Sequence, residues 1–330
     1  MRKDREGAVL VIVLIVLATA TFLIIESARL IRIDYANSAY QRTLVAGGGL
    51  VRSGVAVAQE LLMDDLKKHS DGADHKFDGW YDFDEFLQSV SGSLESGEIS
   101  GNIEPEEGRI NVNRLVGNSP ESVQLGEVFV RLVSGVCSQQ GIRCNPKPYL
   151  ESIKAWTGGP DKKGDKRWYA EQDPPYSLSG VSFRSPDELL LVRWEGMTRE
   201  SVAKVYNGTE SVPGLREFVT IWGNGKINMN TARSEILYAI VSDGDKREAY
   251  VASVENYRSN GANQLSSPWF VGIAAAQGID MSKFPSKALG VKSEAFRVTV
   301  NATVGVGLLR STSIVKRSTK GPVVLFQNIY

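Results

Sequence analysis

The sequence predicts an α+β protein in which a long N-terminal helix packs on a small antiparallel sheet, with a large all-α domain inserted into the chain. Three observations lead to this prediction. An apolar helical pattern opens the chain, and strand-like alternating runs close it. Short helical patterns joined by Gly/Pro loops fill about 170 residues between them.

The N-terminal segment has the length and composition of a membrane span. A charged leader, MRKDREG, ends at Gly7, and about eighteen uncharged, mostly apolar residues follow from Ala8, which is roughly 27 Å of helix. Basic residues before the span favour a cytoplasmic N-terminus, so the rest of the chain is expected on the far side of the membrane. A leader cleaved after Gly7 and an uncleaved signal anchor both fit this segment.

The helix is expected to continue well beyond the span. Apolar residues recur at helical spacing from Leu30 to Leu62 without an intervening proline. The triplet Gly47-Gly48-Gly49 weakens the helix locally and would either kink it or allow close packing. The stretch from His69 to Phe86, rich in Asp and Gly, is interpreted as a loop.

The remaining elements are assigned by periodicity and end signals. The run Ile99–Asn113 predicts a hairpin that ends in a strand over Arg109–Asn113. Thr231 is predicted to cap the helix that follows it. Predicted helices are Val123–Val136, Tyr149–Trp156, Pro186–Leu191, Arg199–Tyr206 and Ala232–Val241, and predicted strands are Glu294–Val306, Arg310–Lys316 and Val323–Tyr330.

Composition argues against several classes of function. The chain has 38 basic and 38 acidic residues, and this zero formal charge is unlike a general nucleic-acid binder. Its 2 histidines lie in one polar loop and build neither a catalytic triad nor a zinc site. Cys137 and Cys144 fit no common metal or redox spacing, and they are compatible with a local disulfide or with two buried thiols.

A weak internal repeat links two distant segments. Both EGRINVNRL (from Glu107) and NGKINMNTA (from Asn224) carry the pattern G-[RK]-I-N-[VM]-N. An asparagine at such a turn can accept hydrogen bonds from free backbone N–H groups, which explains the pattern without a ligand.

Taken together, these motifs resemble the minor pseudopilin K family of bacterial type II secretion systems. The resemblance rests on the leader and apolar helix, on EGRINVN, on Trp156 with its polar loop, and on three longer segments. These are WYAEQDPPYSLSGVSFRSPDELLLVR from Trp168, FVTIWGNGKINMNTARSEIL from Phe218 and SEAFRVTV from Ser293. It covers nearly the whole chain, in the family's order.

The resemblance implies a pilin-like fold and a division of the chain. Residues 1–7 would be a prepilin leader and 8–28 the transmembrane and assembly helix. Residues 29–113 and 289–330 would form the pilin-like domain, and 114–288 the inserted helical domain. It further implies cleavage between Gly7 and Ala8 by prepilin peptidase and methylation of the Ala8 amine. The chain would be a single-pass inner-membrane protein with a periplasmic domain.

The resemblance also implies a role and partners. The chain would be a non-catalytic subunit at the tip of the pseudopilus, beside the minor pseudopilins I and J, other pseudopilins and the inner-membrane assembly platform. Most pilin subunits carry Glu at the fifth mature position, where Ile12 stands here, and Glu26 is too far along to substitute. A subunit without that charge suits a cap with nothing above it.

Calcium is the one cofactor that the resemblance raises. The family's helical domain can bind it through acids in the loop after the tryptophan, and the candidates here are Asp161, Asp165, Glu171 and Asp173. Four basic residues interleave with them and oppose a site that needs net negative charge. A solvated charged loop is therefore favoured, and no cofactor is expected.

Three other functions are weighed against this one. A minor pilin of a type IV pilus, in assembly or adhesion, would share the leader and helix. A membrane-anchored nucleic-acid binder would need a basic stripe that the balanced charge does not favour. A tethered enzyme would need a site that the sequence does not offer.

Overall fold

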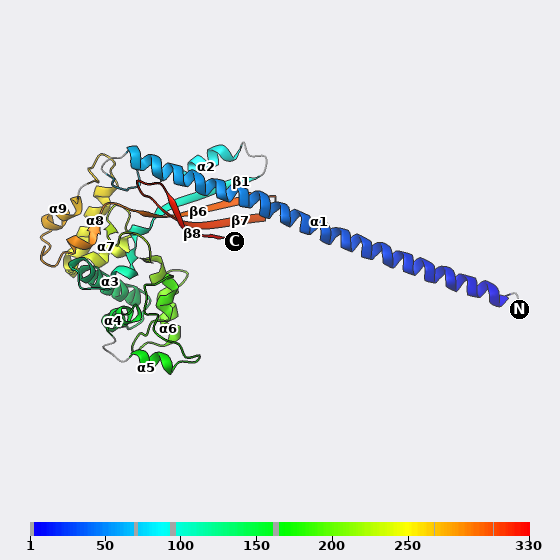
Figure 1. The fold of residues 1–330 in the computed structure, drawn as a ribbon, viewed down its shortest axis with the longest axis horizontal. Helices are drawn as coiled ribbons and strands as arrows, with labels where there is room; N and C mark the ends of the chain where they lie inside the picture. The colour runs from blue at the N-terminus through cyan, green and yellow to red at the C-terminus, as the bar shows by residue number, and fades with distance from the viewer. Residues whose placement is uncertain (1–2, 69–71, 93–96, 161–164, 267, 306) are drawn as a thin grey trace.

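The computed structural model describes residues 3–68, 72–92, 97–160, 165–266, 268–305 and 307–330. Its first element, α1 (Lys3–Lys68), is a single helix of 66 residues that projects far beyond the folded body (Figure 1). The glycine triplet does not interrupt it. At 1.5 Å per residue, α1 is about 100 Å long.

The C-terminal part of α1 packs on the sheet through one stripe of side chains. Val51, Val55, Ala58 and Leu62 are buried at intervals of three and four residues, which places them on one face of the helix. They meet Phe296, Val298 and Val300 of the sheet in a single hydrophobic core.

The sheet is antiparallel, with strand order β1-β6-β7-β8. Its strands are β1 (Glu98–Pro105), β6 (Ala295–Val304), β7 (Gly307–Lys316) and β8 (Val323–Ile329). Successive residues of β6 and β7 alternate between buried and more exposed positions, because one face of the sheet lies under α1. The predicted α+β fold class is confirmed.

A second, larger core belongs to the helical part of the chain, between the first and second strands of the sheet. This core is built from residues between Ile110 and Val291, among them Phe129, Tyr149 and Ile236, together with Ala73 from the loop after α1. Its helices are α3 (Pro120–Gln139), α4 (Pro146–Trp156), α5 (Asp165–Ala170), α6 (Arg199–Asn207), α7 (Ser234–Ile240), α8 (Gly244–Arg258) and α9 (Trp269–Ala276). The helical part lies beyond one end of the sheet (Figure 1).

Two short pairs of parallel strands join distant segments within the helical part. β2 (Ile110–Asn111) pairs with β3 (Val219–Thr220), and β4 (Ile227–Asn228) pairs with β5 (Leu289–Gly290). The predicted hairpin over Ile99–Asn113 is therefore wrong. β1 pairs with β6, the 3₁₀ turn Glu106–Gly108 redirects the chain, and β2 enters the other domain.

Two further expectations differ from the structure. The segment interpreted as a loop ends in the helix α2 (Phe83–Ser91), which buries Phe83 and Leu87 against β1. Thr231 does not cap a helix, since α7 begins three residues later with Arg233 at its N-cap. Thr231 faces the glycine of the Glu106–Gly108 turn instead, and a Cβ on Gly108 would lie 3.0 Å from the Thr231 carbonyl oxygen.

Candidate assembly helix and domain junction

The exposed part of α1 is the first candidate functional surface. From Val9 to Arg42 every side chain is exposed except that of Glu26, and Ile12 retains 61% of its surface. Among the described residues, α1 is the one helix long and apolar enough to cross a membrane, and its apolar stretch has no buried residue. A continuous apolar surface of this length is stable only in lipid or against other helices.

The predicted processing and assembly residues all lie on α1. Gly7 and Ala8 fall within its first turns, and Ile12 follows one turn later. Glu26 is half-exposed and lies 3.8 Å from Arg29, measured between Oε1 and Nη1. It is 14 residues beyond Ile12, or roughly 21 Å along the helix.

The acidic residues proposed as calcium ligands do not form one cluster of carboxylates within the described part of the chain. Asp161 lies outside the described residues. Asp165 is buried and accepts a hydrogen bond of 2.9 Å from Arg193. Glu171 is exposed and pairs with Arg167 at 2.7 Å, and Asp173 is exposed. Two of the three described carboxylates thus already have an arginine partner.

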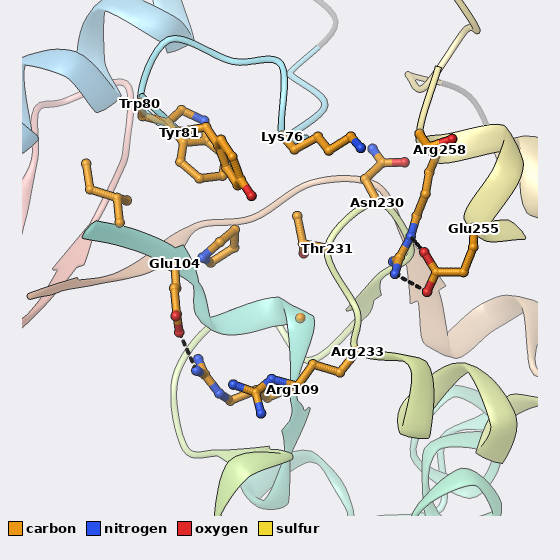
Figure 2. Close-up of a pocket in the computed structure, with 14 residues that line it drawn as sticks. Lys76, Trp80, Tyr81, Glu104, Arg109, Asn230, Thr231, Arg233, Glu255 and Arg258 are labelled. Atoms are coloured by element: carbon orange, nitrogen blue, oxygen red, sulfur yellow. Dashed lines mark hydrogen bonds and ion pairs between the residues drawn. The ribbon is translucent and has the colours of Figure 1, made fainter. Parts of the chain in front are cut away.

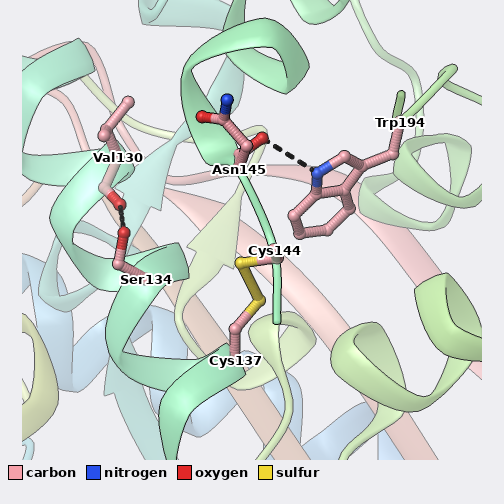
Figure 3. Close-up of a disulfide and its surroundings, with 6 residues drawn as sticks. All are labelled: Val130, Ser134, Cys137, Cys144, Asn145 and Trp194. Carbon is pink, nitrogen blue, oxygen red and sulfur yellow. Dashed lines mark hydrogen bonds between the residues drawn. A yellow bond between two sulfur atoms is a disulfide. The ribbon is translucent and has the colours of Figure 1, made fainter. Parts of the chain in front are cut away.

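Cys137 and Cys144 are joined in the structure, with their sulfur atoms 2.28 Å apart (Figure 3). Cys137 lies in the last turn of α3, and Cys144 lies just before α4. Beside them, Trp194 donates from Nε1 to the Asn145 carbonyl at 3.1 Å. The bond therefore fixes the turn between two core helices.

A buried ionic cluster joins α1, the following loop and the end of β7. We call it the Arg317 cluster, and it consists of Arg317, Asp65 and Asp74. Arg317 donates to Asp65 at 2.7 Å and also to Asp74. All three residues are at least nine-tenths buried. Burial raises the pKa of Asp74 to about 7, although the charge of Arg317 acts in the opposite direction.

Two buried glutamates in the Glu106–Gly108 turn link the sheet to the helical domain. Glu106 accepts from Arg297 of β6 at 2.8 Å and from Thr220 of β3. Glu107 accepts from the backbone N–H of Glu294 at 2.8 Å. Burial raises the pKa of Glu107 to about 7, and the backbone donors partly offset this rise.

The repeated asparagine pattern builds the same turn twice. Asn111 accepts from the N–H of Asn113 at 3.0 Å, and Asn228 accepts from the N–H of Asn230 at 2.9 Å. Each asparagine also donates from its amide to a carbonyl elsewhere in the chain, Trp222 for Asn111 and Asp74 for Asn228. Both motifs therefore have structural roles at the junction.

A cleft of about 310 Å³ lies between the two domains (Figure 2). Trp80 and Tyr81 form part of its wall on the sheet side, and Asn230 and Thr231 lie on the helical side. Three arginines line it, and each is paired with a glutamate. These pairs are Arg109–Glu104 at 2.7 Å, Arg258–Glu255 at 2.6 Å and Arg233–Glu217 at 3.5 Å. Lys76 also lines the cleft. Nothing in the sequence patterns pointed to this cleft.

Comparison with known proteins identifies the fold. No protein-family model matches the sequence, and no curated protein matches it. Among solved structures, the chain is similar to one from the GspK–GspI–GspJ complex of the enterotoxigenic Escherichia coli Type 2 Secretion System. The TM-score is 0.60 at 17% sequence identity, over 90% of this chain and 99% of the other. The fold is therefore GspK-like, as the resemblance in the sequence predicted.

Proposed function

We propose that this protein is a minor pseudopilin of a type II secretion system, of the K type. The observation that carries the proposal is the union of three parts in one chain. A long helix with an exposed apolar half is joined to a small antiparallel sheet, and a helical domain is inserted between the first two strands of that sheet. The similar solved chain comes from a complex of three such secretion components.

The proposal assigns the N-terminal segment to processing and membrane insertion. Prepilin peptidase would cut between Gly7 and Ala8 and the new Ala8 amine would be methylated. Cleavage removes Arg2, Lys3 and Arg5, the charges that hold the N-terminus on the cytoplasmic side. The apolar helix that remains could leave the bilayer and pack against the helices of other pseudopilins.

A position at the tip of the pseudopilus fits the residue at the fifth mature position. Ile12 offers no charge to the terminal amine of a neighbouring subunit, so the subunit would need no neighbour above it. The helical domain supports the same position, since it lies beyond one end of the sheet and off the line of α1 (Figure 1). In this role the protein has no catalytic task and would nucleate or cap the filament that exports folded proteins.

The first test is the mass of the intact protein from cells with and without prepilin peptidase. A mature chain that begins at N-methylated Ala8, and only when the peptidase is present, is the expected result. A chain that retains Met1 in both strains would contradict the proposal. Co-purification of the full chain with the I and J pseudopilins of the same system tests the partners, and capture of neither would count against the K type.

A further inference from the structure

The two edge strands of the sheet, β1 and β8, differ in whether their outward backbone groups are hydrogen-bonded. At the β1 edge, the outward N–H of Ile99 donates to the Ser91 hydroxyl at 3.1 Å. The N–H of Gly101 donates to Asp84 at 2.9 Å. Both acceptors come from α2, which packs along β1. Side chains of α2 thus satisfy two outward N–H groups of this edge, and α2 itself stands where a second strand would add.

The β8 edge is open along its backbone. Arg310 of β7 and Tyr330 exchange two backbone hydrogen bonds, of 2.7 and 2.8 Å. In an antiparallel pair such residues alternate with residues that point away, so Gln327 and Ile329 direct their N–H and C=O groups outward. No strand or side chain of the described residues pairs with these groups.

The side chains of β8 are also uncovered, on both faces. α1 lies over β6 and β7 but does not extend over β8. On the face that α1 covers elsewhere, Val324 is 38% and Ile329 is 37% exposed; on the opposite face, Phe326 is 48% exposed. No charged side chain occurs from Val323 to Tyr330. Exposed edge strands in soluble monomers usually carry charges or bulges that discourage pairing; β8 has one irregularity, between Val324 and Phe326, but it carries no charge and exposes an apolar surface.

We propose that the outer edge of β8 is a docking strand for an extended segment of a partner pseudopilin, which would add to the sheet beside Gln327 and Ile329. This inference rests on the proposed function for the class of partner. The partner strand would be uncharged and apolar at alternate positions, to match the exposed side chains of β8. The main-chain hydrogen bonds would give affinity, and the side chains would give selectivity.

The direction of α1 disfavours a second copy of this chain that pairs in the antiparallel sense, and so favours a different subunit in that arrangement. α1 runs along the strands of the sheet (Figure 1). Two copies that paired their β8 strands in the antiparallel sense would be related by a two-fold axis perpendicular to the sheet, which reverses every direction in the plane of the sheet. Their α1 helices would then point in opposite directions, and one membrane could not hold both in the same topology. A partner whose strand has the opposite direction relative to its own helix meets no such conflict.

Hydrogen exchange at single amides tests the inference on the full chain in detergent, alone and with the I and J pseudopilins. We expect the Gln327 and Ile329 amides to exchange at least tenfold more slowly in the complex. The Asn328 amide should change little, because its N–H points to β7 in the free protein. Unchanged exchange at Gln327 and Ile329 in a complex that does form would overturn the inference and leave the proposed function standing. Failure of any complex to form would overturn both.

Two variants and a control sharpen the result. Gln327→Pro removes an outward N–H, which an edge strand tolerates, and Phe326→Lys places a charge on the exposed face. Each should weaken capture of the partner at least tenfold. Val123→Lys changes a side chain of α3 that is 52% exposed and should leave capture unchanged. If two differently tagged copies of this chain protect the same amides without a partner, the proposed occupant is wrong.

Discussion

Arg317, the first residue after β7, donates a buried hydrogen bond of 2.7 Å to Asp65 in the last turn of α1. The two residues are 252 positions apart in the sequence. Their contact fixes the end of the long helix to the end of the sheet, at the side where the helical domain begins. The Arg317 guanidinium also donates a hydrogen bond to Asp74, and it lies 4.8 Å from the centre of the Phe296 ring.

Replacing Arg317 with Met should strongly destabilise the protein. The variant leaves two carboxylates in a buried site without their cation, and removal of one partner from a buried pair costs about 3–5 kcal/mol. Urea unfolding of the purified chain in detergent, followed by circular dichroism, measures the loss. Lys316→Met is the control, because Lys316 is half-exposed and lies 3.8 Å from Glu294, so its loss should cost under about 1 kcal/mol. Equal losses in the two variants would contradict this account.

Gly54 is the position where α1 approaches the sheet most tightly among its glycines. A Cβ at Gly54 would lie 2.8 Å from Cγ1 of Val300 and 3.1 Å from Cδ1 of Ile99. Gly54→Ala should therefore push α1 away from β6 and lower the free energy of unfolding by roughly 1–3 kcal/mol. Gly49→Ala is the matched control, since nothing lies within 4 Å of its added Cβ. That variant should be neutral or more stable by about 1 kcal/mol, because Ala favours the helix.

Glu107 should make the stability of the domain junction depend on pH. Its pKa of about 7 in the folded protein exceeds the ordinary value of 4.5. The free energy of unfolding is therefore highest below the ordinary value and falls as the pH rises towards 7, by roughly 3 kcal/mol for this group. The glutamine in Glu107→Gln cannot ionise. The free energy of unfolding of this variant should therefore rise relative to that of the wild type as the pH is raised across that interval. Denaturant melts at several pH values measure the difference between the two proteins.

The comparison with wild type isolates Glu107, because Asp74 contributes to the pH dependence of both proteins in the same direction. Glu210→Gln, at an exposed position between α6 and β3, should follow the wild-type curve. A Glu107→Gln curve that runs parallel to the wild type would show that the carboxyl is ionised throughout the interval.

The bond between Cys137 and Cys144 should stabilise the folded chain by about 2 kcal/mol, the chain-entropy value for so short a loop. Cys144→Ser is expected to unfold at a lower temperature than the wild type. Reduced wild type should match the variant, and the variant should not respond to reductant. A wild type that is equally stable with and without reductant would mean that the bond does not contribute.

Ile12→Glu tests the account of the fifth mature position. The change lies outside the leader, so cleavage after Gly7 should proceed as in the wild type, as mass spectrometry would detect. Under the proposed function, the added carboxylate could pair with the terminal amine of another subunit. Loss of cleavage in this variant would contradict the role assigned to the position.

The elements that the sequence predicted correctly are those whose pattern repeats over many residues. The long helix carries its apolar stripe from Leu30 to Leu62, and β6 and β7 alternate along most of their length. α8 gave no such signal, because its 15 residues are mostly polar and it buries only Tyr250, Val251 and Val254. Phe83 and Leu87 were a helical pair in α2, but the surrounding Asp and Gly residues favoured a loop.

The candidate sites divide in the same way. A cleavage site between Gly7 and Ala8 could be proposed from the sequence because its signal is local, and it stays a prediction. The Glu106–Gly108 turn could not, because its conformation depends on donors almost two hundred residues away, at Glu294 and Arg297. The Arg317 cluster and the cleft at the junction likewise exist only after distant segments have met. The predictions for Ile12, for calcium and for the peptidase stay predictions.

Between the apolar run and the first buried position near Gly47, α1 crosses about twenty residues, or roughly 30 Å, as uninterrupted helix. A helix without a break behaves as a rigid rod. A displacement of its N-terminal end along the helix axis would therefore also move the sheet and everything fixed to it. Because the helical domain lies off the axis of α1, a rotation of α1 about that axis would carry the domain along an arc around it (Figure 1).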